Sequence, residues 1–197
     1  MKRLLLLASA GVGMAIVAVG AAIAPALAGD GPLSPEVQEI RAAVAKYHSF
    51  EQAEQDGYTV EGEPCVSSPP APPSPDGGGT MGIHAINPPL LGDLAIDQQR
   101  PEILLYVPKE NGKLELVGVE YWMIALANTA SGPRPWFGPQ EPPLGFFNPA
   151  PEVLGRTFDG PMEGHNPMMP WHYDLHVWVA EANPSGVFAM YNPAISC

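Results

Sequence analysis

The residues most suited to chemistry lie in a short alternating segment, from His172 to Val179. Alternation of this kind predicts a β-strand, and it places His172, Asp174 and His176 on one face. Side chains two residues apart on a strand stand about 7 Å apart, so two of them can reach one cation if they converge. So short a pattern has little power to identify a metal site. The competing interpretation is therefore that these residues form the polar outer face of an edge strand.

Glu120 is the second unusual residue, since it lies in the middle of an apolar segment. A buried carboxylate must be paired, protonated or bound to a cation. Together with His84, and with His172 or His176, it would form a compact set of nitrogen and oxygen ligands suited to zinc, copper or iron. The competing interpretation is a buried ion pair or hydrogen bond with an arginine, for which the candidates are Arg100, Arg134 and Arg156.

A third cluster, at residues 165–172, contains two histidines and two methionines, and exported copper sites use such soft ligands. Methionines in a proline-rich loop also fill gaps over a core, so copper specificity is a secondary hypothesis. The sequence assigns no catalytic residue. It predicts a metal site for zinc or copper with five candidate ligands: His84, Glu120, His172, Asp174 and His176.

Strands are needed to position these side chains, and the pattern predicts an antiparallel set. Asn111 and Gly112 form a hairpin signal, which predicts antiparallel pairing of the segments on either side. The second of these segments is largely apolar on both faces, with Leu116, Gly118 and Glu120 on the same face, so it is expected to be a central strand. The predicted strands are residues 81–86, 103–107, 113–125, 153–158, 172–180 and 187–191.

Two short helices are expected before the strands. Ser34 followed by Pro35 is typical of a helix start, and apolar residues then recur three and four positions apart as far as Tyr47. A second start at Ser49 and a stop at Gly57 predict a break between the two helices. The predicted fold class is α+β, with short N-terminal helices packed on an antiparallel β-sandwich or barrel.

The cysteines and prolines constrain the surface of this domain. The chain has two cysteines, Cys65 and Cys197, and neither lies in a CxxC spacing. In an oxidising compartment such a pair predicts a disulfide, which would fasten the C-terminus beside a Pro/Gly-rich surface loop at residues 63–79.

The N-terminal segment predicts export. A basic start is followed by an uncharged apolar run and by small residues that end at Ala28, which is the pattern of a signal peptide at residues 1–28. Cleavage near Ala28 would leave one domain, residues 29–197, in the periplasm or outside the cell. The length of the apolar run leaves open an uncleaved membrane anchor.

The charge of the chain bears on its partners. The formal net charge is −12, and it becomes −14 when Lys2 and Arg3 leave with the signal peptide. This charge argues against nucleic acid and anionic membrane surfaces as partners, and it leaves open a small ligand or a protein. The chain contains no GxSxG elbow, no HExxH helix and no phosphate-binding glycine loop.

Several strings together resemble a group of exported bacterial proteins of unknown function. They are MGIH at residues 81–84, RPEILLY at 100–106, LVGVEY at 116–121, HYDLHVW at 172–178 and the final Cys197. The resemblance extends over most of the mature chain. It implies secretion and a shared fold, and it assigns no role to any residue.

These observations lead to three hypotheses about function. The first is an exported domain that binds a transition metal, for binding or storage rather than catalysis. The second is a non-catalytic extracellular module without metal, whose loop aromatics hold a ligand or partner: Trp136, Phe137, Phe146, Phe147 and Trp171. The third is a cupin-like metal-dependent enzyme, which would need an open coordination position.

Overall fold

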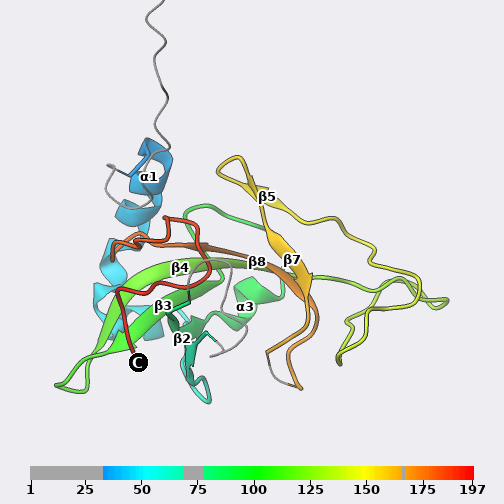
Figure 1. Ribbon diagram of the computed structural model, residues 1–197, viewed down its shortest axis with the longest axis horizontal. Helices are drawn as coiled ribbons and strands as arrows, with labels where there is room; N and C mark the ends of the chain where they lie inside the picture. Colours follow the sequence, from blue (N-terminus) through cyan, green and yellow to red (C-terminus); the bar gives the residue numbers. More distant parts are fainter. Residues whose placement is uncertain (1–32, 69–77, 166) are drawn as a thin grey trace, which may run out of the picture.

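The computed structural model describes residues 33–68, 78–165 and 167–197. Its centre is a six-stranded antiparallel sheet with the strand order β1-β2-β3-β4-β8-β7, which curls into a half-barrel (Figure 1). Short helices accompany the sheet, so the α+β class is confirmed. The predicted signal peptide (1–28) and the middle of the predicted surface loop lie outside the described residues.

The bounds of the elements are as follows. The helical segments are α1 (Pro35–Val44), the 3-10 helix η1 (Ala45–His48), α2 (Phe50–Gln55) and α3 (Pro88–Leu91). The strands of the main sheet are β1 (Cys65–Ser67), β2 (Thr80–Ile86), β3 (Ile103–Pro108), β4 (Leu114–Ile124), β7 (Asp159–Met162) and β8 (His172–Val177). A separate two-stranded ribbon consists of β5 (Glu152–Val153) and β6 (Arg156–Thr157).

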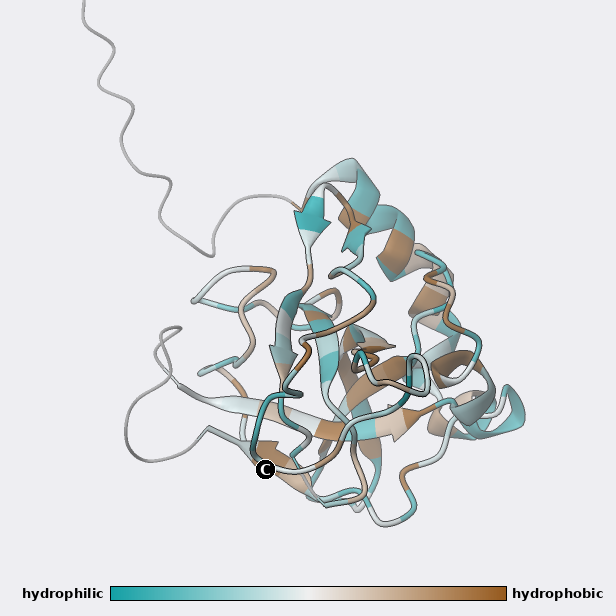
Figure 2. Cartoon of the chain, turned by 90° about the vertical axis from the view of Figure 1, so that its right-hand side faces the viewer, coloured by the Kyte–Doolittle hydropathy of each residue, from teal (hydrophilic) through white to brown (hydrophobic). Residues whose placement is uncertain are grey.

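The N-terminal helices form as the sequence predicts. The Ser34 hydroxyl accepts a hydrogen bond from the Val37 backbone N–H at 3.4 Å, and Pro35 occupies the first helical position. The chain then continues through η1, and extended backbone at Ser49 separates it from α2. In Figure 2 apolar segments appear in brown both along the helices and in the strands, whereas the rest of the helical surface is teal.

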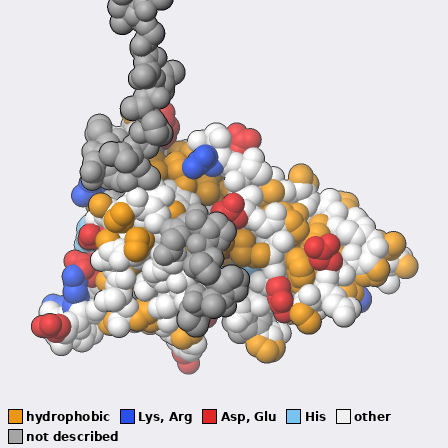
Figure 3. Space-filling model, viewed as in Figure 1, with side chains coloured by type: hydrophobic (Ala, Val, Ile, Leu, Met, Phe, Trp, Pro, Cys, Tyr) orange, Lys and Arg blue, Asp and Glu red, His pale blue; other side chains and the backbone are white. Residues whose placement is uncertain are grey.

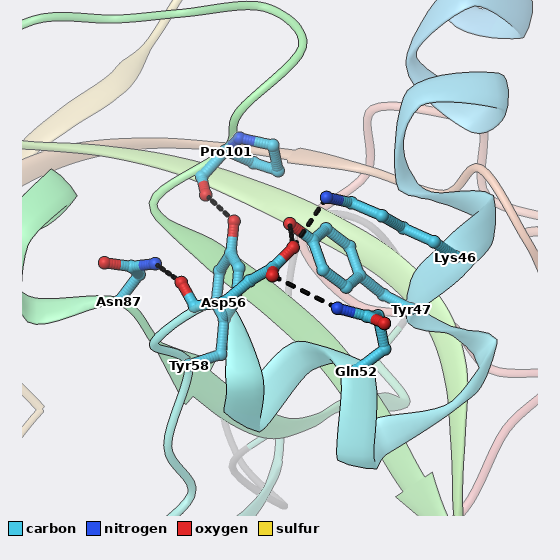
Figure 4. Close-up of polar contacts among 7 residues, drawn as sticks. All are labelled: Lys46, Tyr47, Gln52, Asp56, Tyr58, Asn87 and Pro101. Carbon is cyan, nitrogen blue, oxygen red and sulfur yellow. Dashed lines mark hydrogen bonds and ion pairs between the residues drawn. The ribbon is translucent and has the colours of Figure 1, made fainter.

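A polar network around Asp56 fixes these helices against the sheet (Figure 4). The Asp56 carboxylate accepts from Lys46 Nζ at 2.6 Å, from the Tyr47 hydroxyl at 3.0 Å and from Gln52 Nε2 at 3.1 Å. Asn87, which follows β2, donates to the Asp56 carbonyl at 3.0 Å. The Tyr58 hydroxyl donates to the Pro101 carbonyl at 2.7 Å, just before β3 begins. The network therefore joins the helices to both ends of the β2–β3 connection.

Each face of the sheet packs against its own core. The helix-side face joins α1 and α2 to a group of buried strand residues: Leu104, Tyr106, Val119, Tyr121, Leu175 and Val177. The opposite face holds the second core: Ile103, Leu105, Val107, Val117, Trp122 and Trp178. The five candidate metal ligands all belong to strands and lie on this second face: His84, Glu120, His172, Asp174 and His176.

The β3–β4 hairpin pairs antiparallel as predicted, but its register shifts inside the pair. Leu105 lies opposite Gly118 whereas Tyr106 lies opposite Leu116, so Val117 is the extra residue of a bulge. The bulge turns Val117 into the second core and Leu116 into the helix-side core. The expectation that Leu116 shares a face with Glu120 is therefore wrong.

Two predicted strands differ from the structure. Residues 187–191 form no strand, because β8 already pairs with β4 on one edge and with β7 on the other. Their carbonyls instead hold Trp178, whose backbone N–H donates to Val187 at 2.9 Å and whose indole donates to Ala189 at 2.6 Å. The strand expected at 153–158 is divided between β5 and β6, and the chain joins the main sheet only afterwards, as β7.

The C-terminal segment is tied to β1 and β2. Cys65 and Cys197 form the predicted disulfide. Thr80 and Asn192 exchange two backbone hydrogen bonds at 3.0 Å, and a Cβ at Gly79 would lie 2.5 Å from the Asn192 backbone. Gly82 has a φ of +99°, and a Cβ there would lie 2.5 Å from the Tyr106 carbonyl oxygen. Both glycines permit a close approach of another backbone segment that a side chain would block.

No helix in the part of the chain that the structure describes combines the length and apolar character needed to cross a membrane.

Candidate metal centre

The strand register brings three candidate ligands from three strands to one point. Glu120 on β4 lies directly opposite His176 on β8, and on its other side it lies opposite Ile103 on β3. Ile103 pairs in turn with Ile86 on β2, two residues beyond His84. Since side chains two residues apart on a strand share a face, His84 stands on the same face, diagonally across from Glu120.

The ligand atoms of this cluster lie at metal-ligand spacing. Oε2 of Glu120 is 3.1 Å from Nε2 of His84 and 3.8 Å from Nε2 of His176. One ligand atom from each of the three residues lies within 4.8 Å of the other two. Ligands about 2.1 Å from a tetrahedral ion lie roughly 3.4 Å from each other, so the observed separations bracket the value required.

The cluster is buried and its hydrogen bonds are incomplete. The side chains of Glu120 and His176 are 3% and 2% exposed, and that of His84 is 10% exposed. Neither Oε2 of Glu120 nor Nε2 of His176 has a hydrogen bond of acceptable geometry, even though both atoms are buried. Buried polar atoms without partners cost stability, and a bound cation would satisfy both atoms at once.

The electrostatics of the three residues favour a negative carboxylate between imidazoles. Burial by itself raises the pKa of Glu120, but the charges of His176 and His84 outweigh burial and hold this pKa below its usual value. Burial by itself lowers the pKa of His84, but the charge and hydrogen bonding of Glu120, together with the charges of Glu63 and Asp174, raise the pKa overall. Glu120 therefore keeps the negative charge that attracts a cation.

The alternative of a buried arginine ion pair is wrong. Among the described residues, the ion-pair contacts of Glu120 are with His84 and His176. Arg156 instead lies over the ring of Phe188, 4.6 Å from its centroid. The histidines, and not an arginine, provide the polar surroundings of the carboxylate.

His172 and Asp174 lie farther along the same face. Asp174 pairs with Trp122, and His172 pairs with Ile124, on the side of β8 that carries His176. Both side chains are completely buried, and all six residues of β8 are buried. The edge-strand interpretation is therefore wrong, because β8 lies between β4 and β7. The three residues share a face as predicted, but the three-residue ligand cluster contains only His176 of this strand.

A pocket that the sequence did not predict opens onto the cluster. It has a volume of about 760 Å³, and its wall includes His84 and Glu120. Its other walls come from β1, β2, β3 and the loop after β7, with these residues among them: Cys65, Val66, Ile86, Ile103, His165 and Met169. Small-ligand sites typically have volumes of about 300–1,000 Å³, so this pocket is large enough for a small molecule. The histidine and methionine cluster of the sequence thus forms part of the wall of this pocket.

The loop aromatics divide into two groups. Trp171 is buried, and Trp136 and Phe146 are partly buried against the helix-side core. Phe137 and Phe147 are 50% and 60% exposed. Figure 3 shows hydrophobic side chains in orange on the lobe at the right, which the yellow-green loops of Figure 1 form. Of the aromatic residues predicted to hold a ligand or partner, only Phe137 and Phe147 are therefore exposed enough to do so.

Sequence reasoning did not select Glu102 as an unusual residue. Its side chain is buried at the start of β3, and its Oε2 accepts a hydrogen bond from the Trp122 backbone N–H at 3.1 Å. Burial raises the pKa of Glu102 to about 8, the hydrogen bonds from the backbone of Glu102 and Trp122 oppose this rise, and the charges of Asp93 and Glu120 add to it. The local sequence contains no signal for this burial.

The fold and the site together define an α+β domain with a curled antiparallel sheet and a buried cluster of two histidines and one glutamate that could hold a metal ion. Comparison of the chain with known protein families, with curated proteins and with solved structures finds no match. The functional conclusion therefore depends on the site itself.

Proposed function

We propose that the protein is an exported metal-binding protein that holds one transition-metal ion with His84, Glu120 and His176. The observation that carries this proposal is the pair of buried ligand atoms without a hydrogen bond, Glu120 Oε2 and His176 Nε2, beside His84. A divalent ion would compensate the charge of the carboxylate and would be coordinated by a nitrogen of each imidazole. The expected role is metal binding or storage.

The donor set favours zinc or copper. Two imidazole nitrogens and one carboxylate oxygen form a borderline ligand set, and the order of affinities for such sites rises to copper and then falls slightly at zinc. The separations of 3.1 Å and 3.8 Å suit a tetrahedral ion with an additional ligand.

Export is part of the same proposal. The Cys65–Cys197 disulfide is typical of proteins in an oxidising compartment. It agrees with the signal peptide that the sequence predicts and with the resemblance to exported bacterial proteins. The excess of acidic residues attracts cations to the surface and disfavours nucleic acid and anionic membranes as partners.

Metal analysis of the purified mature protein tests the proposal. After incubation with zinc or copper and removal of free metal, at least one equivalent should stay bound, and the midpoint of thermal unfolding should rise because only the folded state forms the site. Less than about a tenth of an equivalent, together with an unchanged midpoint, would remove the basis of the proposal.

The pocket favours a second candidate function, a metal-dependent enzyme. Three protein ligands leave at least one position of a four-coordinate ion for water or substrate, which is typical of catalytic zinc sites. The pocket reaches His84 and Glu120, so a small molecule bound there would lie next to this position. Glu120 and both histidines would hold the ion, which would supply Lewis-acid activation of a water or substrate at the pocket.

Exogenous anions distinguish an open centre from a closed one. In protein loaded with Co²⁺, azide is expected to change the visible absorption spectrum by displacing water from the open position. The Val66→Trp variant should keep the cobalt but lose most of this response, because Val66 lines the pocket. An unchanged spectrum in the unsubstituted protein would contradict the enzyme candidate and leave metal storage.

A further inference from the structure

The second polar pair on the site face has a geometry that hydrogen bonding does not explain. Nε2 of His172 lies 3.7 Å from Oδ2 of Asp174, and both side chains are 0% exposed. This separation is too long for a hydrogen bond. Nε2 of His172 and both carboxylate oxygens of Asp174 are buried without a hydrogen-bond partner. A fully buried carboxylate without partners requires compensation from elsewhere.

The other ring nitrogen of His172 indicates what that compensation is. Nδ1 lies 3.1 Å from the Pro170 carbonyl oxygen. A carbonyl only accepts, so Nδ1 carries a proton, and in the neutral ring Nε2 then presents a lone pair towards Asp174. Histidines that bind metals commonly donate their second N–H to a backbone carbonyl in this way. Two acceptors that face each other need a proton or a metal ion between them, and 3.7 Å is longer than a shared proton can bridge.

The surroundings of the pair hold the imidazole in place and offer a cation no competing basic side chain. Trp122 stacks on His172 with ring centroids 5.5 Å apart and an interplanar angle of 21°, which holds the imidazole in place. His165 lies edge-on to the same ring at 5.5 Å and also lines the pocket. The ion-pair contact of Asp174 within the described residues is with His172, and no lysine or arginine takes part.

From these contacts we propose that His172 and Asp174 form a second binding site for a divalent transition-metal ion, next to the His84, Glu120 and His176 centre on the same sheet face. Its ligands are Nε2 of His172 and the carboxylate of Asp174, whose 3.7 Å separation is close to the roughly 3.4 Å expected for two ligands of one tetrahedral ion. Two protein ligands bind more weakly than three, so this site fills after the first. His165 connects it to the pocket.

Zinc stoichiometry of the full mature protein tests this inference. Equilibrium dialysis against increasing zinc should reveal two classes of site, one tight and one weaker, with two equivalents at saturation. The Asp174→Asn variant should lose the weaker class and keep the tight one, and the retained tight site shows that the variant is folded. Glu39→Gln, a change of an exposed carboxylate on α1, should leave both classes intact.

Cadmium NMR counts the sites independently of dialysis. Protein loaded with ¹¹³Cd²⁺ should show two cadmium resonances in the NMR spectrum, and Asp174→Asn should retain one of them. One equivalent and one resonance, both unaffected by Asp174→Asn, would overturn the second site and leave the proposed function intact. One equivalent that Asp174→Asn removes and His84→Ala does not would overturn the proposed function and support the second site.

Discussion

Replacing His176 with alanine is expected to lower the affinity of the centre for zinc by at least about 100-fold, since loss of a direct ligand exceeds the 10–100-fold effects seen for residues that only support ligands. The imidazole supplies one of three ligand atoms, and its Nε2 is buried without a hydrogen bond. The rise in thermal midpoint on adding zinc should disappear with the affinity, because ligand-linked stabilisation depends on the ratio of free metal to Kd. Isothermal titration with a competing chelator measures the change.

His48 provides a matched control for this substitution. It is one of the five histidines of the chain, and it is exposed at the end of η1, away from the sheet face that holds the ligands. His48→Ala should therefore bind zinc like the unsubstituted protein. Equal affinity of His176→Ala and His48→Ala would show that the bound ion lies elsewhere.

The local parts of this site were accessible from the sequence. Alternation in β8 correctly assigned His172, Asp174 and His176 to one face, because strand periodicity is a property of the chain itself. The Asn-Gly hairpin gave the pairing of β3 with β4, and the position of Glu120 within apolar residues indicated a buried carboxylate. These inferences require no knowledge of distant segments.

The meeting of the ligands depends on register, which the sequence does not contain. Glu120 faces His176 only because β4 and β8 pair at that register, and a slip of one residue would turn either side chain to the opposite face. The bulge at Val117 shows how one local irregularity changes the faces of its neighbours. The pocket depends on the packing of loops that have no periodic pattern, so no single-sequence signal could locate it.

The burial of Glu102 follows from the same long-range packing. The pairing of β3 with β4 ends at Ile103, which lies opposite Glu120. The Trp122 backbone N–H, beyond this end, therefore has no partner on β3 and donates to the Glu102 carboxyl group. The backbone of Glu102 is bonded as well, because the Asn87 backbone N–H donates to the Glu102 carbonyl at 2.9 Å. Glu102 is therefore only 1% exposed at this strand end, and its burial there raises the pKa of its carboxyl group to about 8.

Folding stability is therefore expected to fall as the pH rises from about 4.5 to 8, because the unfolded chain releases the Glu102 proton in this range and the folded chain retains it. The contribution is fully present below pH 4.5 and is lost above pH 8, and its size is on the order of 5 kcal/mol. Glu102→Gln keeps an acceptor for Trp122 and cannot ionise, so its advantage over the unsubstituted protein should grow across this range. Urea unfolding in the presence of a chelator measures the difference, and Glu39→Gln, an exposed carboxylate on α1, should show none. A constant difference between Glu102→Gln and the unsubstituted protein from pH 5 to 9 would mean that Glu102 ionises normally in the folded state.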